Sequence, residues 1–419
     1  MPWVKLPDRL ASLRRTRRRG DGDDEVIYLI APSGHPNYGD ELIARAWLQH
    51  LARVRPDATV ILDSHTAGQA GLLLHGIHPN VVFVDTLWQL THYAADTTRT
   101  DGPDPTQPWT WVAQAATELG LAPRLAEGVD AFRNASSVHL LGGGYINQVW
   151  PHHVSLVVAA AELVRTTGAT AFASGQGLIP RVEGPAWSVL RDAAAQFTVF
   201  DVRDEASSVA LSGVGSRRHT GDDAWLALDR PSGTGGLREP APMATGGVTL
   251  CLQSDLTDDF TAHGMTGPDA LARVVGSVLD AWRVPGSAVT VIEGIPGGDL
   301  DIPSRLGDRL EGATIIPFID IWRSGLPVGR GDTWISTRFH PHLVAAAAGD
   351  SGVAIIPRPD YYATKHRSLA AAGSRWTIVD DPEVIPTRPT AGGFSTDDRD
   401  RAVAAKRALA HRLYPRRRR

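Results

Sequence analysis

Short apolar segments alternate with amphipathic segments along the first half of the chain. Positions 42, 43, 46, 47 and 51 are apolar and follow the period of a helix. We predict strands at 26–30, 59–62, 81–84, 138–141, 170–173 and 197–200. We predict helices at 41–54, 111–119, 154–166 and 186–195. Strands separated by helices are typical of βαβ units, which build a parallel sheet.

A cluster of proline and glycine interrupts this alternation at 231–247, and the alternation then starts again. The strands predicted beyond it are 248–252, 288–292, 314–316, 334–336, 353–356 and 376–379. The predicted helices are 269–282, 302–310, 343–348, 361–372 and 396–413. The pattern therefore predicts an α/β fold of two Rossmann-like parallel-sheet domains that face each other across a cleft.

The predicted domain organisation has five parts. A basic tail at 1–24 precedes an N-terminal domain at 25–230, which carries the glycine loops. The linker at 231–247 leads to a C-terminal domain at 248–395, and a final helix with a basic tail occupies 396–419. A chain of 419 residues is too long for one ordinary core, which also favours two domains.

Composition narrows the class of protein. The chain is 42% hydrophobic and 21% charged, which is typical of a globular enzyme, and its net charge of −4 does not favour nucleic-acid binding. The single cysteine, Cys251, excludes an internal disulfide. We expect no export signal and a cytoplasmic location. The basic ends are typical of solvated tails, and the alternative is that they hold the protein at the inner face of an anionic membrane.

The segment Ser336-Thr337-Arg338-Phe339-His340 follows a predicted strand and precedes an alanine-rich helix. Ligands of open α/β sheets bind where strands end. The guanidinium of Arg338 suits a carboxylate or a phosphate, and His340 can carry a proton near neutral pH. This pair predicts chemistry on a small phosphorylated acid. The alternative is a structural cap beside a turn histidine.

Other loops that follow predicted strands carry glycine or polar residues. One of them, at 34–41, is a tight turn in which Asp40 is a candidate helix N-cap. Another contains Gly142, Gly143 and Gly144, where backbone N–H groups can approach an anion closely. A glycine triplet has neither the dinucleotide fingerprint nor the P-loop spacing, so it indicates no particular nucleotide.

Two more strand ends carry candidate binding residues. Gln176 stands between glycines, and we predict that its amide faces the cleft. Arg203 precedes two acidic residues at a helix start, where a local ion pair is the alternative to a ligand contact. His152 and His153 are adjacent and would point in different directions on a helix. No Asp or His group has the spacing typical of metal ligands, so we predict no metal site.

In combination, these loops resemble the polysaccharide pyruvyl transferase family. No motif is specific alone, but their order over roughly residues 26–370 makes a chance match improbable. The matching segments are Asn37-Tyr38-Gly39-Asp40-Glu41, Leu141-Gly142-Gly143-Gly144, Gly175-Gln176-Gly177-Leu178-Ile179-Pro180, Val202-Arg203-Asp204-Glu205, Thr220-Gly221-Asp222-Asp223, Ser336-Thr337-Arg338-Phe339-His340, and Tyr362 with Lys365.

The resemblance implies a fold like that of the GT-B glycosyltransferases. It implies transfer of a pyruvyl group from phosphoenolpyruvate, as co-substrate, to a sugar of a cell-surface polysaccharide or lipid-linked glycan, usually as a cyclic ketal, with no cofactor. Arg338 and Arg203 are implied as donor anchors with Lys365 as a third, and His340 as the catalytic residue that moves protons. Further substrate contacts are implied for Asn37, Asp40, Gly142, Gly143, Gly144 and Gln176. We expect the acceptor on the side of the N-terminal domain at 25–230 and the donor on the side of the C-terminal domain at 248–395.

Two other functions stay open. A GT-B glycosyltransferase using a nucleotide sugar often carries paired glutamates in its second domain, and Glu293 and Glu311 are too far apart for that. A catalytically silent family member is the other alternative, and the presence of Arg203, Arg338 and His340 argues against it. The sequence specifies neither the acceptor sugar, nor the ketal position and stereochemistry, nor the oligomeric state.

Overall fold

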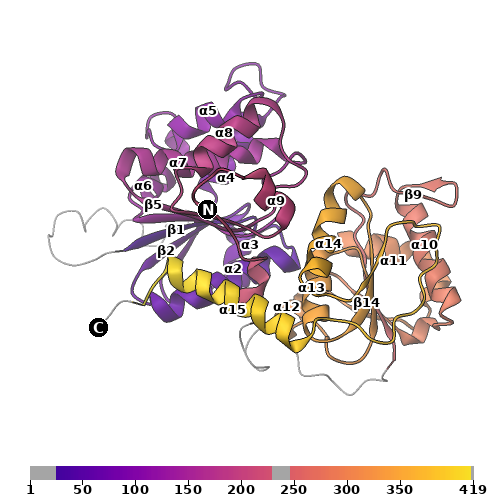
Figure 1. The fold of residues 1–419 in the computed structure, drawn as a ribbon. Coiled ribbons are helices and arrows are strands. Elements are labelled where there is room, and N and C mark those ends of the chain that lie inside the picture. The colour runs from indigo at the N-terminus through magenta and orange to yellow at the C-terminus, as the bar shows by residue number, and fades with distance from the viewer. Residues whose placement is uncertain (1–24, 229–245, 417–419) are drawn as a thin grey trace, which may run out of the picture.

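Two parallel β-sheets form the frame of the molecule (Figure 1). The computed structural model describes residues 25–228 and 246–416. The predicted basic segment at 1–24, most of the predicted linker at 231–247 and the last three residues of the predicted basic tail lie outside the described residues.

The first sheet has seven strands in the order β3-β2-β1-β4-β5-β6-β7, and every neighbouring pair is parallel. Its strands are β1 (Val26–Ile30), β2 (Thr59–Asp63), β3 (Val81–Val84), β4 (Ser137–Leu140), β5 (Thr170–Gln176), β6 (Val199–Val202) and β7 (Arg217–His219). All five residues of β1 are buried, because helices cover both faces of a parallel sheet.

The second sheet has six strands in the order β12-β11-β8-β13-β14-β15, again all parallel. Its strands are β8 (Val248–Cys251), β11 (Val289–Ile292), β12 (Thr314–Ile316), β13 (Thr333–Ser336), β14 (Ser351–Ile355) and β15 (Thr377–Val379). A separate antiparallel pair consists of β9 (Thr261–Ala262) and β10 (Met265–Thr266).

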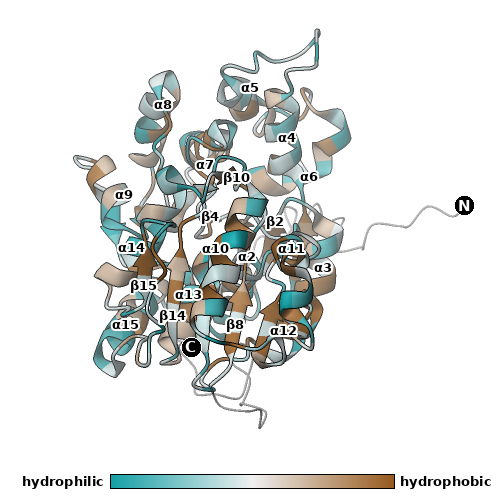
Figure 2. Cartoon of the chain, turned by 90° about the vertical axis from the view of Figure 1, so that its right-hand side faces the viewer, coloured by the Kyte–Doolittle hydropathy of each residue, from teal (hydrophilic) through white to brown (hydrophobic). Residues whose placement is uncertain are grey.

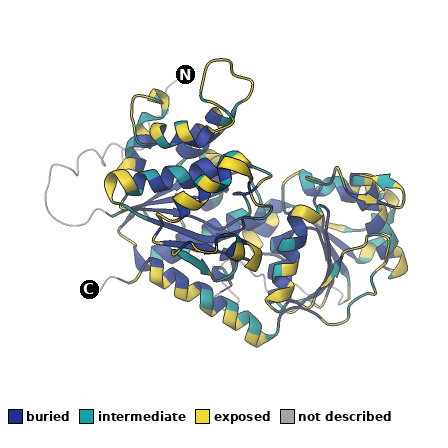
Figure 3. Ribbon diagram, turned by 45° about the horizontal axis from the view of Figure 1, so that its top comes forward, coloured by how far each residue is buried: buried dark blue, intermediate teal, exposed yellow. Residues whose placement is uncertain are grey.

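Helices pack on both faces of each sheet. In Figure 2 the strands are mostly brown and the helices carry teal on their outer sides, and in Figure 3 the same sheets are dark blue. The helices of the first half are α2 (Tyr38–Val54), α3 (Ala67–Leu74), α4 (Thr86–Ala95), α5 (Pro108–Ala115), α6 (Ala126–Arg133), α7 (Val154–Thr167), α8 (Gly184–Ala194) and α9 (Glu205–Ala210). Those of the second half are α10 (Pro268–Ala281), α11 (Asp301–Leu306), α12 (Phe318–Ser324), α13 (Phe339–Ala347), α14 (Thr364–Ala371) and α15 (Thr396–Leu413).

This architecture confirms the predicted fold class of two Rossmann-like parallel-sheet domains. Several element boundaries were predicted wrongly. The helix predicted at 302–310 ends early because Gly307 adopts a φ of +51°, and a 3₁₀ turn, η6 (Gly307–Leu310), replaces its last part. The segment predicted as a helix at 361–372 begins instead as a π turn, η7 (Pro359–Ala363), before α14.

The helix α15 leaves the second sheet and packs against the first (Figure 1). Its Lys406 is completely buried, and its Nζ lies 2.9 Å from carboxylate oxygens of both Asp201 and Asp223. Burial alone would lower the pKa of Lys406, but the two carboxylates raise it above its ordinary value. The last helix therefore completes the N-terminal domain.

Direct contacts also join the two sheets' domains. The N–H of Tyr38 donates to the carbonyl of Gly294 at 2.9 Å. The guanidinium of Arg45 lies 3.2 Å from the ring centre of Trp322 and donates to its carbonyl oxygen at 3.0 Å. The indole N–H of Trp322 donates in turn to the carbonyl of Leu73. These contacts hold the carboxyl ends of the two sets of strands toward each other.

Within the described residues, no helix combines the length and apolar character needed to cross a bilayer.

Candidate active site

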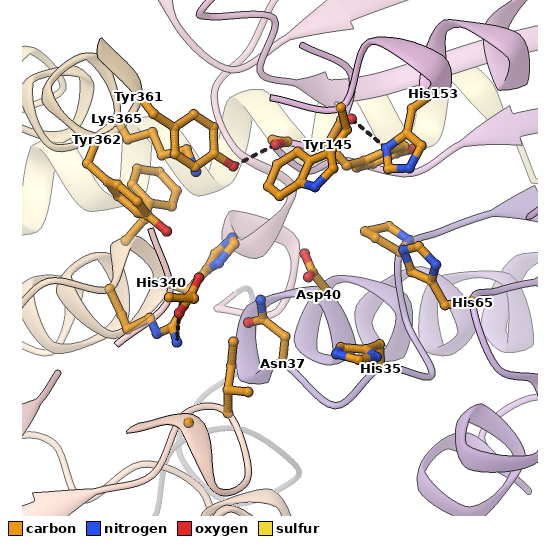
Figure 4. Close-up of a pocket in the computed structure, with 18 of the residues that line it drawn as sticks. His35, Asn37, Asp40, His65, Tyr145, His153, His340, Tyr361, Tyr362 and Lys365 are labelled. Carbon is orange, nitrogen blue, oxygen red and sulfur yellow. Dashed lines mark hydrogen bonds and ion pairs between the residues drawn. The ribbon is translucent and has the colours of Figure 1, made fainter. Parts of the chain in front are cut away.

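A cavity of about 580 Å³ lies where the strands of both sheets end. Loops after β1, β2, β4 and β6 form one wall together with His92 of α4, and loops after β8, β11, β13 and β14 form the other. This is the position at which open α/β sheets bind ligands. Figure 4 shows His340 and Lys365 approaching from the second domain and Asn37 and Asp40 from the first.

His340 meets the N-terminal domain directly. Its Nε2 lies 3.4 Å from Oδ1 of Asp222, which is buried. Burial alone would raise the pKa of Asp222, but His340 and Arg203 lower it to about 2, so Asp222 is a carboxylate at neutral pH. The ring of His340 also packs on Gly39, where an added methyl group would overlap it. The first turn of α2 and Asp222 thus fix the position of His340.

The side chain of Arg203 is buried and makes no short ion pair. Its side chain is 3% exposed, and the nearest carboxylate oxygens, on Asp204 and Asp222, lie at 3.6 and 3.7 Å. Its Nε has no hydrogen-bond partner among the described residues. Buried polar groups without partners are rare in folded proteins, so this guanidinium is poised for a ligand. The guanidinium occupies space that is free because Gly144 and Gly177 have no side chains.

Arg338 lines the same cavity but is already engaged. Its Nε donates to Asp299 at 3.1 Å, and its Nη2 contacts both Asp299 and Asp255. Burial alone would lower the pKa of Arg338, but the two carboxylates raise it well above its ordinary value. The guanidinium that was predicted to bind a ligand through two N–H groups is therefore largely occupied by carboxylates of the protein. Only Nη1 has no hydrogen bond within the described part of the chain.

Lys365 and Asp40 add two groups with shifted acidity. The amine of Lys365 lies 3.3 Å from the ring centre of Tyr361 and 4.5 Å from that of Tyr362. Burial, followed by the charge of Arg203, lowers the pKa of Lys365 well below its ordinary value. Burial raises the pKa of Asp40 to about 6, against the opposing effect of His340. Such shifts are typical of residues that exchange protons.

Three residues of the predicted site make hydrogen bonds that serve the fold. Asn37, and not Asp40, caps α2: its side chain accepts from the N–H of Gly39 at 3.2 Å. Asn37 still lines the cavity. The N–H of Gly142 donates to Asp223, and that of Gly143 to the carbonyl of Gly175. Two of the three N–H groups predicted to hold an anion are thus occupied, while Gly144 lines the cavity.

The prediction that the side-chain amide of Gln176 faces the cleft was wrong. Its side-chain amide is buried and donates to the carbonyls of Leu141 at 2.7 Å and of Ser174 at 3.1 Å. A further bond from the same amide to the carbonyl of Leu140 at 3.2 Å joins β5 to β4. The flanking glycines allowed the side chain to turn into the core as readily as into the cleft.

Several residues that line the cavity, or that contact residues lining it, were not predicted as site residues. Asp222 belongs to the matched segment Thr220-Gly221-Asp222-Asp223, which was the signal that could have identified it. Asp255 and Asp299 have no local signal, because only the folded chain brings them to Arg338. The histidines at one end of the cavity, His35, His65, His92, His152 and His153, come from four separate loops and helices.

Comparison with solved structures finds proteins that align along nearly the whole chain. A UDP-N-acetylglucosamine 2-epimerase is 10% identical, with a TM-score of 0.51 over 94% of this chain and 96% of that chain. MurG of Acinetobacter baumannii is 13% identical, with a TM-score of 0.46 over 94% and 99% of the two chains. At 10% identity, the similarity to the epimerase shows a shared fold and nothing more. No curated protein matches the sequence.

A family model gives the more specific result. The model of polysaccharide pyruvyl transferase matches residues 37–262, more than half of the chain, from the α2 turn through Gly142–Gly144, Arg203 and Asp222. The matched stretch includes most of the residues that form the first wall of the cavity. The chain belongs to the polysaccharide pyruvyl transferase family.

Proposed function

We propose that this protein transfers the pyruvyl group of phosphoenolpyruvate to a sugar of a cell-surface polysaccharide or lipid-linked glycan and forms a pyruvate ketal. The observation that carries the proposal is the buried guanidinium of Arg203, whose Nε lacks a partner among the described residues and which faces a cavity shared by both domains. A small, highly anionic donor would satisfy it.

Phosphoenolpyruvate fits the charges of this cavity. It carries a carboxylate and a phosphate, and the cavity holds Arg203, Lys365 and the remaining Nη1 of Arg338. Arg203 is the principal anchor in this proposal, because Asp299 and Asp255 already balance most of the charge of Arg338. Donor binding would also favour the protonated form of Lys365, whose charge burial opposes.

The proton transfers can be assigned to groups on the cavity wall. Protonation of C3 of the enol makes C2 electrophilic, one sugar hydroxyl adds there with loss of its proton, and the C2–phosphate bond breaks. A second hydroxyl of the same sugar then adds to C2 and loses its proton, which completes the ketal. One of the two released protons replaces the one consumed at C3, and the other leaves with inorganic phosphate.

In this scheme His340, oriented by Asp222, protonates C3, and Asp40 accepts the proton of a hydroxyl. The pKa of about 6 at Asp40 makes it a carboxylate at neutral pH that is still basic enough to assist. Arg203 and Lys365 stabilise the departing phosphate. The side chains of His340, Asp40, Arg203 and Lys365 all line one cavity, and Asp222 contacts His340.

The test is phosphate release from phosphoenolpyruvate in the presence of a cell-wall glycan or lipid-linked glycan fraction. We expect release that depends on the fraction and is lost in Arg203→Met. The matched control is Arg165→Met, since Arg165 is 70% exposed on α7 and does not line the cavity. Direct binding of phosphoenolpyruvate, measured by calorimetry, should be lost in Arg203→Met alone.

Three results would refute the proposal. One is a folded wild-type protein that neither binds phosphoenolpyruvate nor releases phosphate with any fraction. Another is acceptor-dependent consumption of a nucleotide sugar instead, which would establish the glycosyltransferase alternative. The third is binding of phosphoenolpyruvate without phosphate release, which would assign the chain to the silent members of its family.

A further inference from the structure

Three histidines meet at the end of the cavity remote from His340. His92 comes from α4, and His152 and His153 come from η2 (Pro151–His153), the 3₁₀ turn before α7. Each offers a ring nitrogen, and these nitrogens all lie within 4.8 Å of one another. The adjacent pair was expected to diverge as on a helix, but the 3₁₀ turn brings their ring centres to 4.3 Å.

The hydrogen bonding of His153 prepares it as a ligand. Its Nδ1 lies 2.8 Å from the backbone carbonyl of Tyr145, drawn as a dashed line in Figure 4. A carbonyl oxygen only accepts, so Nδ1 carries the proton and Nε2 keeps its lone pair. A ligating histidine almost always donates its other N–H in this way, which fixes both the tautomer and the ring orientation.

The hydrogen bonds within the described residues leave ring nitrogens of the cluster available. His92 and His152 make none through their rings, and His153 uses only its Nδ1. Neutral imidazoles offer such lone pairs to a shared cation, as metal binding requires.

We propose that His92, His152 and His153 bind a divalent transition metal, with Zn²⁺ the best-suited ion, and leave one coordination position open to the cavity. Imidazole nitrogen is a preferred ligand of Zn²⁺, and three protein ligands with a fourth, open position are typical of zinc sites that act on bound molecules. Tetrahedral binding at Zn–N distances of about 2.0–2.1 Å places the nitrogens about 3.4 Å apart. His92 is exposed, so rotation of its ring can close the remaining distance.

All three histidines line the cavity that also holds Arg203 and His340. The open position therefore takes water or an oxygen atom of a molecule bound in the cavity. This inference is independent of the proposed donor, because it concerns the opposite end of the cavity and other residues. Its test does not need a turnover assay.

The experiment is calorimetric titration of the full chain, without a polyhistidine tag and after treatment with a chelator, with Zn²⁺. We expect saturable binding of one ion per chain, and binding at least tenfold weaker in His92→Ala and in His153→Ala. His75→Ala is the control, because His75 is exposed and lies outside the cluster. Co²⁺ in place of Zn²⁺ should give the visible absorption of a four-coordinate site, lost in His92→Ala.

The outcomes separate a built site from adventitious binding. His153 is buried, so its variant must first be shown to fold by circular dichroism; if it does not, His92→Ala decides, since that ring is exposed. Absence of saturable Zn²⁺ binding would overturn the proposal. So would binding of unchanged affinity in the variant that combines His92→Ala, His152→Ala and His153→Ala.

Discussion

The ring of His340 occupies a space that a glycine at position 39 leaves free. Because His340 belongs to α13 and Gly39 to the first turn of α2, this contact positions a group of one domain through the backbone of the other. The asparagine cap at residue 37 starts α2 early enough to bring Gly39 under the ring. The glycine is thus required for the site and not for the backbone conformation of the helix.

Gly39→Ala is expected to displace the His340 ring and to lower kcat by ~10²–10⁴-fold, the usual contribution of a general acid–base group. The helix itself should tolerate alanine, which is favoured over glycine by roughly 0.5–1 kcal/mol. The matched control is Gly68→Ala in α3, where a new methyl group meets no atom within 4 Å. Steady-state kinetics of both variants are the measurement. Full activity in Gly39→Ala would contradict the role of this contact.

The raised pKa of Asp40 predicts that ionisation of Asp40 lowers the free energy of unfolding as the pH rises. Burial raises the pKa of Asp40 to about 6, above the value of about 3.9 in an unfolded chain. The native state therefore favours the proton, and the stability that this gives is present below pH 4 and is lost as the pH rises through 6. Asp40→Asn should thus be more stable than the wild type at pH 7, on the order of 1 kcal/mol given the partial exposure of Asp40.

The measurement for Asp40 is urea unfolding of both proteins at pH 4 and pH 7. The difference should vanish at the lower pH. Asp192→Asn, which removes an exposed carboxylate of α8, controls for the change in net charge. A variant that is less stable than the wild type at pH 7 would show that Asp40 is held by favourable contacts instead.

At the residue scale, the sequence predicted which side chains stand at strand ends but not which way they turn. Arg203, Arg338 and His340 do line the cavity, whereas the amide of Gln176 points into the core. A residue between two glycines has no local feature that selects one direction. The partners of Arg338 and His340 come from distant segments, and their pairing depends on the packing of both domains.

At the element scale, periodicity predicted the long elements well. The helix α15 was predicted with its observed bounds, Thr396–Leu413, because its pattern is long and its cap, Ser395, is a good one. The strand β7 was missed, since its three residues, Arg217–His219, are all polar and it lies at the sheet edge. That α15 returns to the first sheet was also not predicted, because two buried carboxylates far upstream determine it.

Lys406→Met is expected to destabilise the protein by about 3–5 kcal/mol, because it leaves the buried carboxylates of Asp201 and Asp223 without their cation. The control on the same helix is Arg401→Ala. Arg401 is 73% exposed, and its ion pair with Asp398 should contribute at most about 1 kcal/mol. Urea unfolding at pH 7 measures both. Equal effects of the two substitutions would contradict the conclusion that the buried ion pairs of Lys406 hold α15 against the first sheet.

At the scale of the whole molecule, the cavity belongs to neither domain alone. Arg203 follows β6 of the first sheet, and Arg338 and Lys365 follow β13 and β14 of the second. A ligand held by these groups binds only when both domains are folded and correctly placed. Binding should therefore stabilise the molecule as one unit.

Phosphoenolpyruvate at 100 times its Kd should raise the free energy of unfolding by about 2.7 kcal/mol, in a single transition that includes both domains. Thermal unfolding followed by circular dichroism and by tryptophan fluorescence measures this, since Trp47 lies in the first domain and Trp334 in the second. Arg203→Met should lose the stabilisation and Arg165→Met should keep it. A ligand effect confined to one of two separate transitions would contradict a shared site.

The return of α15 to the first sheet has a consequence for synthesis on the ribosome. The ion pair between Asp201 and Lys406 cannot form until Lys406 has been translated, 205 residues after Asp201. At about 5–20 residues per second, the first domain stays incomplete for about 10–40 s after its own strands have emerged. The two domains therefore cannot mature strictly in chain order. We expect nascent chains arrested before residue 396 to remain sensitive to protease in the N-terminal half and to become resistant when α15 is added in trans as a peptide. Resistance without α15 would show that the first domain folds alone.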